Sequence, residues 1–137
     1  MSMLSALKIS SSAMTAQMVR LNTTASNLAN MDVVGSTIEE AYKAKKPIFK
    51  TVMENYSNNN FEASVLVNGI HVTDRANTKR YDPQNPAASK DGFVFMSNVN
   101  SIEEMVDMTN ASRSYQTNVE VMNATKKMMM STLQLGK

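Results

Sequence analysis

The sequence predicts a mainly α-helical protein, in which long N- and C-terminal helices pair as an antiparallel α-helical coiled coil around an extended, partly β middle segment. Near both ends of the 137-residue chain, apolar residues recur at alternating steps of three and four, the spacing of a heptad repeat. All three prolines lie in the middle, where they would interrupt a helix. A chain of this length is expected to form one modest core.

The N-terminal segment, residues 1–33, is expected to form one amphipathic helix over residues 4–30, about 40 Å long at 1.5 Å per residue. Gly35, which follows two valines, is a reasonable place for the chain to leave this helix. The stripe is interrupted by Ser11, and its other members are Leu4, Leu7, Met14, Met18, Leu21, Ala25 and Leu28.

The C-terminal segment, residues 99–137, repeats this design with a helix from about residue 102 to residue 133. Ser101 followed by Glu104 is typical of a capping box, and Gly136 is placed to close the helix. The stripe contains two polar positions, Ser112 and Lys126. Its other members are Met105, Met108, Tyr115, Val119, Met122, Met129 and Leu133.

The middle segment, residues 34–98, is expected to be extended chain with a small amount of sheet. Asn68 and Gly69 lie between two apolar runs, a signal for a tight hairpin turn. Asp91 and Gly92 introduce a further short strand, and the asparagine-rich residues 55–60 are expected to form a mobile loop.

No catalytic, cofactor-binding or metal-binding residues are expected. The single histidine, His71, precedes Asp74 by three residues, and strand alternation would put them on opposite faces, so a half-buried strand residue is the better interpretation. Glu103, Glu104 and Asp107 could be imagined as ligands of a divalent cation, but they are better explained as helix-start charges on a solvated face.

Composition selects against several classes of partner. The net charge of +2 is spread along the chain, which favours neither nucleic acid nor an anionic membrane. No stretch of about 18 apolar residues occurs, so neither a membrane span nor a cleaved signal peptide is expected. The absence of cysteine rules out disulfides and thiolate metal sites.

Amides and hydroxyls replace charges along the first helix. Only Lys8 and Arg20 are charged within residues 1–31, whereas thirteen positions are Ser, Thr, Asn or Gln. Depletion of charge is typical of the cores of protein–protein interfaces. We therefore expect Asn27 and Asn30 to face neighbouring copies, so that a charge introduced at Asn27 would cost little in the isolated chain. Eleven of the thirteen methionines lie in the two terminal segments and suit such adaptable contacts.

Two motifs resemble the flagellar rod and hook family of axial proteins. "SNLANMDVVGS", residues 26–36, resembles the signature "ASNLAN" that ends the N-terminal helix of this family, and residues 97–136 resemble its C-terminal helix almost throughout. The short length, residues 81–100 and the ending "TLQLGK" are most similar to proximal rod members. The chain departs from the family at Ser97, where members usually carry Pro, and at Asn85, where they carry His.

The resemblance implies a structural subunit of the proximal rod, the drive shaft of the bacterial flagellar basal body. Its partners would be other copies of itself, other rod proteins and the flagellar type III export apparatus. That apparatus would deliver it without a cleaved signal peptide to the periplasmic rod. The helices would line the export channel, while the middle would stiffen the tube and transmit torque. The alternative, an inner-rod or needle-type component of a related type III injection system, fits less well because such proteins are shorter and lack the motif pair.

Overall fold

In the computed structural model, which describes residues 3–56 and 60–136, the chain begins and ends with a long helix and forms antiparallel strands in between. The helices are α1 (Met3–Ala29) and α2 (Ser101–Leu135). Between them lie β1 (Val34–Gly35), β2 (Lys45–Tyr56), β3 (Asn60–Val72), β4 (Lys79–Tyr81) and β5 (Phe93–Met96). The expected helices at both ends are therefore confirmed to within a few residues.

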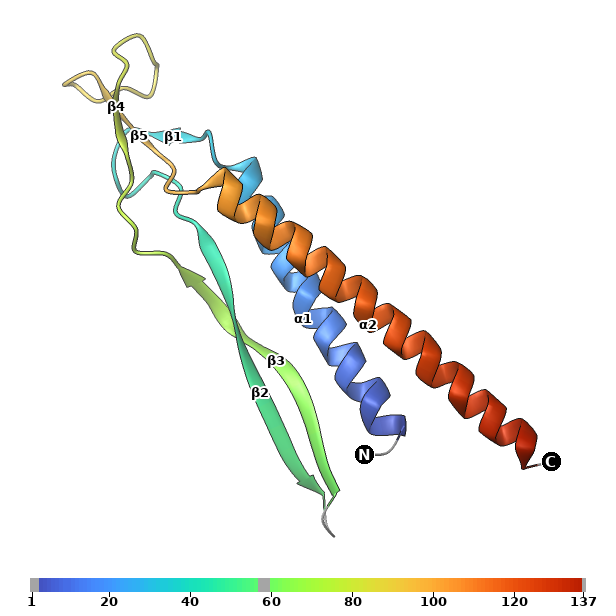
Figure 1. The fold of residues 1–137 in the computed structure, drawn as a ribbon. Coiled ribbons are helices and arrows are strands. Elements are labelled where there is room, and N and C mark those ends of the chain that lie inside the picture. Colours follow the sequence, from blue (N-terminus) through green and yellow to red (C-terminus); the bar gives the residue numbers. More distant parts are fainter. Residues whose placement is uncertain (1–2, 57–59, 137) are drawn as a thin grey trace.

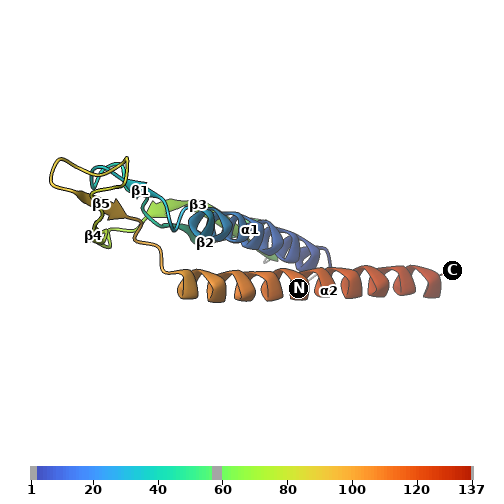
Figure 2. The ribbon, with the colours of Figure 1, turned by 90° about the horizontal axis from the view of Figure 1, so that it is seen from above.

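The helices α1 and α2 lie side by side and run in opposite directions, and α2 projects beyond the start of α1 (Figures 1 and 2). The second helix holds 35 residues and the first 27, which accounts for the overhang. The last turns of α2 therefore have no described helix of the same chain beside them.

The middle segment contains much more sheet than expected. β2 and β3 hold 12 and 13 residues and form an antiparallel ribbon, paired from Lys45 and Val72 at one end to Tyr56 and Asn60 at the other. Asn68 and Gly69 therefore lie within a long paired strand, and the hairpin turn expected there is wrong. The asparagine-rich loop expected over residues 55–60 is also wrong for Asn55, Tyr56 and Asn60, which are strand residues, while residues 57–59 lie outside the described part of the chain.

Asn68 and Gly69 form a bulge within β3. Ile48 and Phe49 are neighbours on β2, but they pair with Gly69 and Val67, so Asn68 is an extra residue on β3. Gly69 has a φ of +136°, a backbone conformation that residues other than glycine rarely adopt. The freedom that glycine gives to a hairpin turn is used here to accommodate an irregularity in a long strand.

A small three-stranded sheet, in the order β1-β5-β4, lies at the end of the helix pair where α1 stops and α2 starts (Figure 1). Its pairs are antiparallel: Val34 is opposite Met96 and Lys79 is opposite Phe95. The strand expected after Asp91 and Gly92 is confirmed as β5. Its Val94 is fully buried and belongs to the core of this region.

Helix α1 is the central layer, because it packs against α2 on one side and against β2 and β3 on the other. The core around it is built from small side chains. The buried apolar residues among those described are Ala16, Ala41, Ala44, Val94 and Ala111. Small side chains let these elements approach closely, but they remove little apolar surface from water.

Gly35 supplies one such close approach, and Gly35→Ala tests it. A methyl group at this position would lie 2.8 Å from the amide nitrogen of Ala41 and 2.9 Å from the carbonyl carbon of Glu40. We expect a loss of about 1–3 kcal/mol in the free energy of unfolding, measured by urea denaturation. Gly136→Ala is the control, because its methyl group would lie 3.7 Å from the carbonyl oxygen of Thr132, an ordinary van der Waals distance. Equal unfolding midpoints for the two variants would contradict this account.

Candidate assembly interface

Six of the nine positions of the predicted stripe on α2 are half-buried, and the other three are exposed. Met108, Tyr115, Met122 and Met129 are half-buried, as expected, and so is Val119. Met105 and Leu133 are instead 60% and 70% exposed. The positions buried most deeply on this helix are Glu104, Ala111 and Thr125. Each of them directly precedes one member of the predicted column Met105, Ser112 and Lys126, so the buried face is turned by about one residue.

Helix α1 shows the same rotation. Leu7, Met14, Leu21 and Leu28 are half-buried, and so is Asn30 just after the helix, whereas Leu4, Met18 and Ala25 are exposed. Ser10 and Thr24 are buried in place of this second column. Short side chains permit two backbones to approach closely, and hydroxyls on a helix can bond to the preceding turn, as Thr125 does to the carbonyl of Val121 at 2.8 Å. Close packing therefore selects small polar residues over Leu and Met.

Both helices consequently leave large apolar side chains exposed on the single subunit. Leu4 and Met18 of α1 are 66% and 49% exposed. On α2 the exposed large apolar residues are Ile102, Met105, Val106, Val121, Met128, Met130, Leu133 and Leu135. Apolar surface of this extent on elongated helices is typical of protein–protein contacts.

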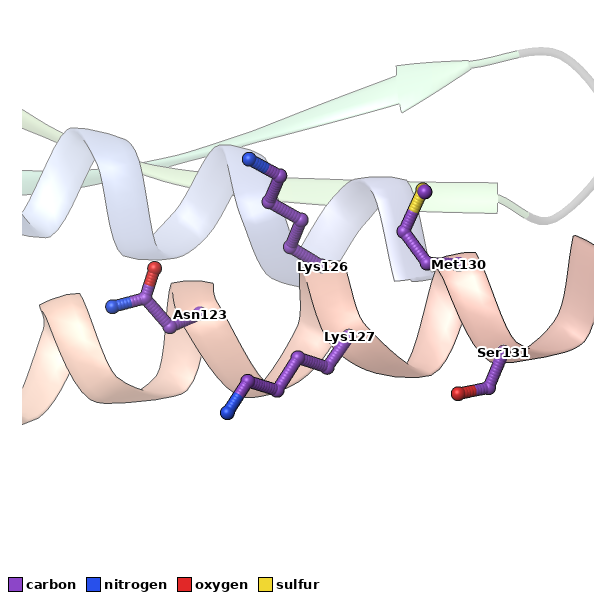
Figure 3. Close-up of a pocket in the computed structure, with 5 residues that line it drawn as sticks. All are labelled: Asn123, Lys126, Lys127, Met130 and Ser131. Atoms are coloured by element: carbon purple, nitrogen blue, oxygen red, sulfur yellow. The ribbon is translucent and has the colours of Figure 1, made fainter.

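A shallow hollow of about 570 Å³ opens on α2 alone (Figure 3). It is lined by Asn123, Lys126, Lys127, Met130 and Ser131. These side chains offer ammonium, amide, hydroxyl and thioether groups, but neither a carboxylate nor an imidazole. The hollow therefore has no acid–base pair, and its chemistry suits contact with another surface.

Asn27 is fully buried and its amide is used within the subunit. Its Nδ2 donates to the carbonyl of Lys45 at 2.8 Å, and its Oδ1 accepts from the amide of Lys45 and from the hydroxyl of Tyr42, both at 3.0 Å. Asn27 thus fastens the start of β2 to the last turn of α1. The expected contact of Asn27 with a neighbouring copy is replaced by this internal one. Asn30, which directly follows α1, is half-buried and donates to the carbonyl of Ser26 in the last turn of that helix, at 2.7 Å.

Further asparagines hold the chain on the other side of the ribbon. Asn98 accepts from the amide of Ala44 at 2.7 Å and donates to the carbonyls of Arg75 and Thr73, at 2.6 and 3.3 Å. Asn100, not Ser101, caps α2, because its side chain accepts from the first amides of the helix and donates to Glu103. The predicted capping box is therefore displaced by one residue.

The charged groups that were weighed as a metal site have other neighbours. Glu103 lies 3.5 Å from Arg75, and Asp107 lies 3.6 Å from Lys46, both on partly exposed side chains. Glu104 is only 3% exposed, so the expectation of a solvated face is wrong for this residue. No group of three potential metal ligands occurs within residues 3–56 and 60–136. His71 lies in β3 opposite Lys46 and is exposed, not half-buried as expected.

Comparison with known proteins agrees with the two motifs found in the sequence. Residues 7–36 match the family model "Flagella basal body rod protein", and residues 90–135 match "Flagellar basal body rod FlgEFG protein C-terminal". Relatives named "Flagellar basal-body rod protein FlgC" occur in Escherichia coli O6:H1, at 41% identity, and in Salmonella typhimurium, at 40% identity, each match covering 99% of both chains. The Bacillus subtilis protein of the same name is 37% identical over 96% of both chains. Neither described helix is apolar enough over a sufficient length to cross a bilayer.

The internal role of Asn27 predicts that Asn27→Asp destabilises the isolated subunit. The substitution replaces the donor that faces the carbonyl of Lys45 with a buried negative charge, so we expect a loss of about 2–4 kcal/mol in the free energy of unfolding. Asn22→Asp introduces the same charge at an exposed position of the same helix and should change it by less than about 0.5 kcal/mol. Thermal unfolding followed by circular dichroism would measure both. If Asn27→Asp unfolds at the same temperature as Asn22→Asp, the hydrogen bonds of the Asn27 side chain do not support the fold.

Proposed function

Since the chain belongs to the FlgC family of flagellar basal-body rod proteins and is a structural subunit of the rod, we propose that it assembles with further copies of itself and with other rod proteins through the exposed faces of α1 and α2. Its location is the flagellar basal body. The alternative of a needle-type component of an injection system is not favoured, because the relatives that match over nearly the whole chain are flagellar. The proposed role requires no catalytic, cofactor or metal site.

The exposed apolar side chains of α2 carry this proposal. Eight large apolar residues of this helix are exposed on the single subunit, among them Leu133 and Leu135 in the overhang beyond α1. Burial of such surface against a neighbour contributes about 25 cal/mol for each Å² removed from water. Because the core of the subunit consists of small side chains, the stabilisation from burying these larger apolar residues is gained only when the rod assembles.

Within each subunit we propose that α1 and α2 form an antiparallel coiled coil. The half-buried residues Leu7, Met14, Leu21 and Leu28 recur every seven positions on α1, and Met108, Tyr115, Met122 and Met129 do so on α2. A sustained seven-residue repeat favours supercoiling of two helices.

The helix pair would line the central channel, with the ribbon and the small sheet packed outside it. Support comes from the attachment of the ribbon, whose base is held by Asn27 from α1 and by Asn98 next to α2. Such joints at both helices would transmit torque from the outer part of the subunit to the inner part with little bending.

We further propose that the flagellar type III apparatus exports the chain, without a cleaved signal peptide, and that it folds into the rod in the periplasm. The absence of cysteine is compatible with this route, because no disulfide has to form after export.

Met105→Glu tests the assembly surface. Met105 is 60% exposed, so the isolated chain should keep its helix content and its unfolding temperature. In the rod the new carboxylate would be desolvated without a partner, and we expect loss of rod assembly and of swimming motility with export intact.

Thr117→Glu is the matched control. Thr117 is exposed on a face of α2 that already carries Arg113 and Glu120, and this variant should be motile. Electron microscopy of basal bodies and soft-agar motility assays would compare the variants in the bacterium from which the chain comes. Normal rods with Met105→Glu would show that this face of α2 is not an assembly surface.

A further inference from the structure

A second hollow, of about 170 Å³, lies where α2 begins. Its walls come from the start of β2, from the chain that follows β3 and from the first turns of α2. The charged residues that line it are Lys46, Arg75, Glu103 and Glu104. Unlike the hollow near Lys126, it is enclosed by segments from three parts of the sequence, held together by the bonds of Asn98.

Most polar side chains around this hollow already have partners. Arg75 pairs with Glu103, and Lys46 pairs with Asp107 just outside the lining. The amide of Asn98 is bonded to three backbone groups. The amide of Asn100 is occupied by the helix cap and by Glu103. None of these groups is left to neutralise a further charge.

Glu104 is the exception. The residue is 3% exposed, and its carboxylate has neither a hydrogen bond nor an ion pair among residues 3–56 and 60–136. Its oxygens are not among the fully buried atoms that lack a partner, so they reach the space of the hollow and are open to a donor. A carboxylate on a side chain that is largely shielded from water gains from such a donor.

The local charges indicate which donor is missing. Three carboxylates, those of Glu103, Glu104 and Asp107, lie near two cations, Lys46 and Arg75, and each cation is paired with a carboxylate other than that of Glu104. One negative charge remains unmatched, so the hollow suits a single positive charge. Ammonium and guanidinium groups provide both the charge and the N–H donors that a carboxylate accepts. A divalent metal is not favoured, because the described residues offer no cluster of three ligands.

We propose that this hollow is a socket for one lysine or arginine side chain of an adjacent rod subunit, with the Glu104 carboxylate as its acceptor. The inference rests on the proposed function, because only assembly brings an adjacent subunit to this site. The hollow is large enough for the end of one long side chain but not for a folded segment.

Glu104→Gln tests the socket because it should act in opposite directions on the subunit and on the rod. Removal of an unpartnered charge from this largely buried side chain should raise the unfolding temperature of the purified chain. Loss of the charged acceptor should weaken the contact between subunits by about tenfold, the effect of losing one hydrogen bond to a charged group, and so lower the number of assembled rods per cell. Glu120→Gln makes the same chemical change on the exposed face of α2 and should leave both quantities unchanged.

Two results for Glu104→Gln would contradict the socket. A lower unfolding temperature for Glu104→Gln would show that the carboxylate is already stabilised within the subunit, and a normal number of rods would show that no neighbour needs it. Either result would overturn the socket while leaving the rod assignment intact. Absence of the wild-type chain from purified basal bodies would overturn the proposed function as well.

A free small cation is a separate possible source of the same chemistry. The purified wild-type chain and Glu104→Gln would each be titrated with ammonium chloride and with methylguanidinium chloride while the unfolding temperature is followed. We expect no saturable stabilisation specific to the wild type. Such stabilisation would assign the hollow to a dissolved cation and overturn the proposed contact between subunits.

Discussion

The amide of Asn27 is the interaction on which the arrangement of this subunit depends. It bonds to both the carbonyl and the amide of Lys45, so the side chain pairs with the backbone much as a neighbouring strand would. This places the first residue of β2 against the last turns of α1, and the ribbon then runs back along the helix (Figure 1). A side-chain amide supplies N–H donors and a carbonyl acceptor on separate atoms of one neutral group, so Asn27 can be fully buried at this junction with its hydrogen bonds made.

The position of α1 between two partners explains much of its unusual composition. Ser12 accepts from the amide of Val65 on the ribbon, at 3.1 Å, and the Arg20 guanidinium lies 4.6 Å from the centre of the Phe49 ring. Ser10 and Thr24 are buried as well. Hydroxyls and amides are therefore favoured over charges on this helix by its own subunit, before any neighbour in the rod is considered. The charge depletion that suggested an assembly surface has an internal cause on part of the helix circumference.

The division between small buried side chains and large exposed ones fits a protein that functions in an assembly. Ala16 and Ala111 are buried, whereas Met105 and Leu133 are exposed. A monomeric protein of this size would normally bury its largest apolar residues, because these contribute most to stability. In this subunit the closest contacts fix the geometry of the fold, and the larger apolar groups remain available to neighbouring subunits.

The sequence by itself determined the two helices, the short strand β5 and the family, because heptad spacing and a continuous motif are local properties of the chain. It did not determine which of two adjacent columns of residues each helix buries. Glu104 and Met105 are neighbours in the sequence, and an argument from periodicity favours the column of Met105 because it is more apolar. Nor could the sequence show that Asn68 and Gly69 lie within a strand, because these residues suit a bulge as well as a turn. Tertiary structure decided these points: the close approach of the helices selects small side chains, and the partner of Asn27 lies 18 residues further along the chain.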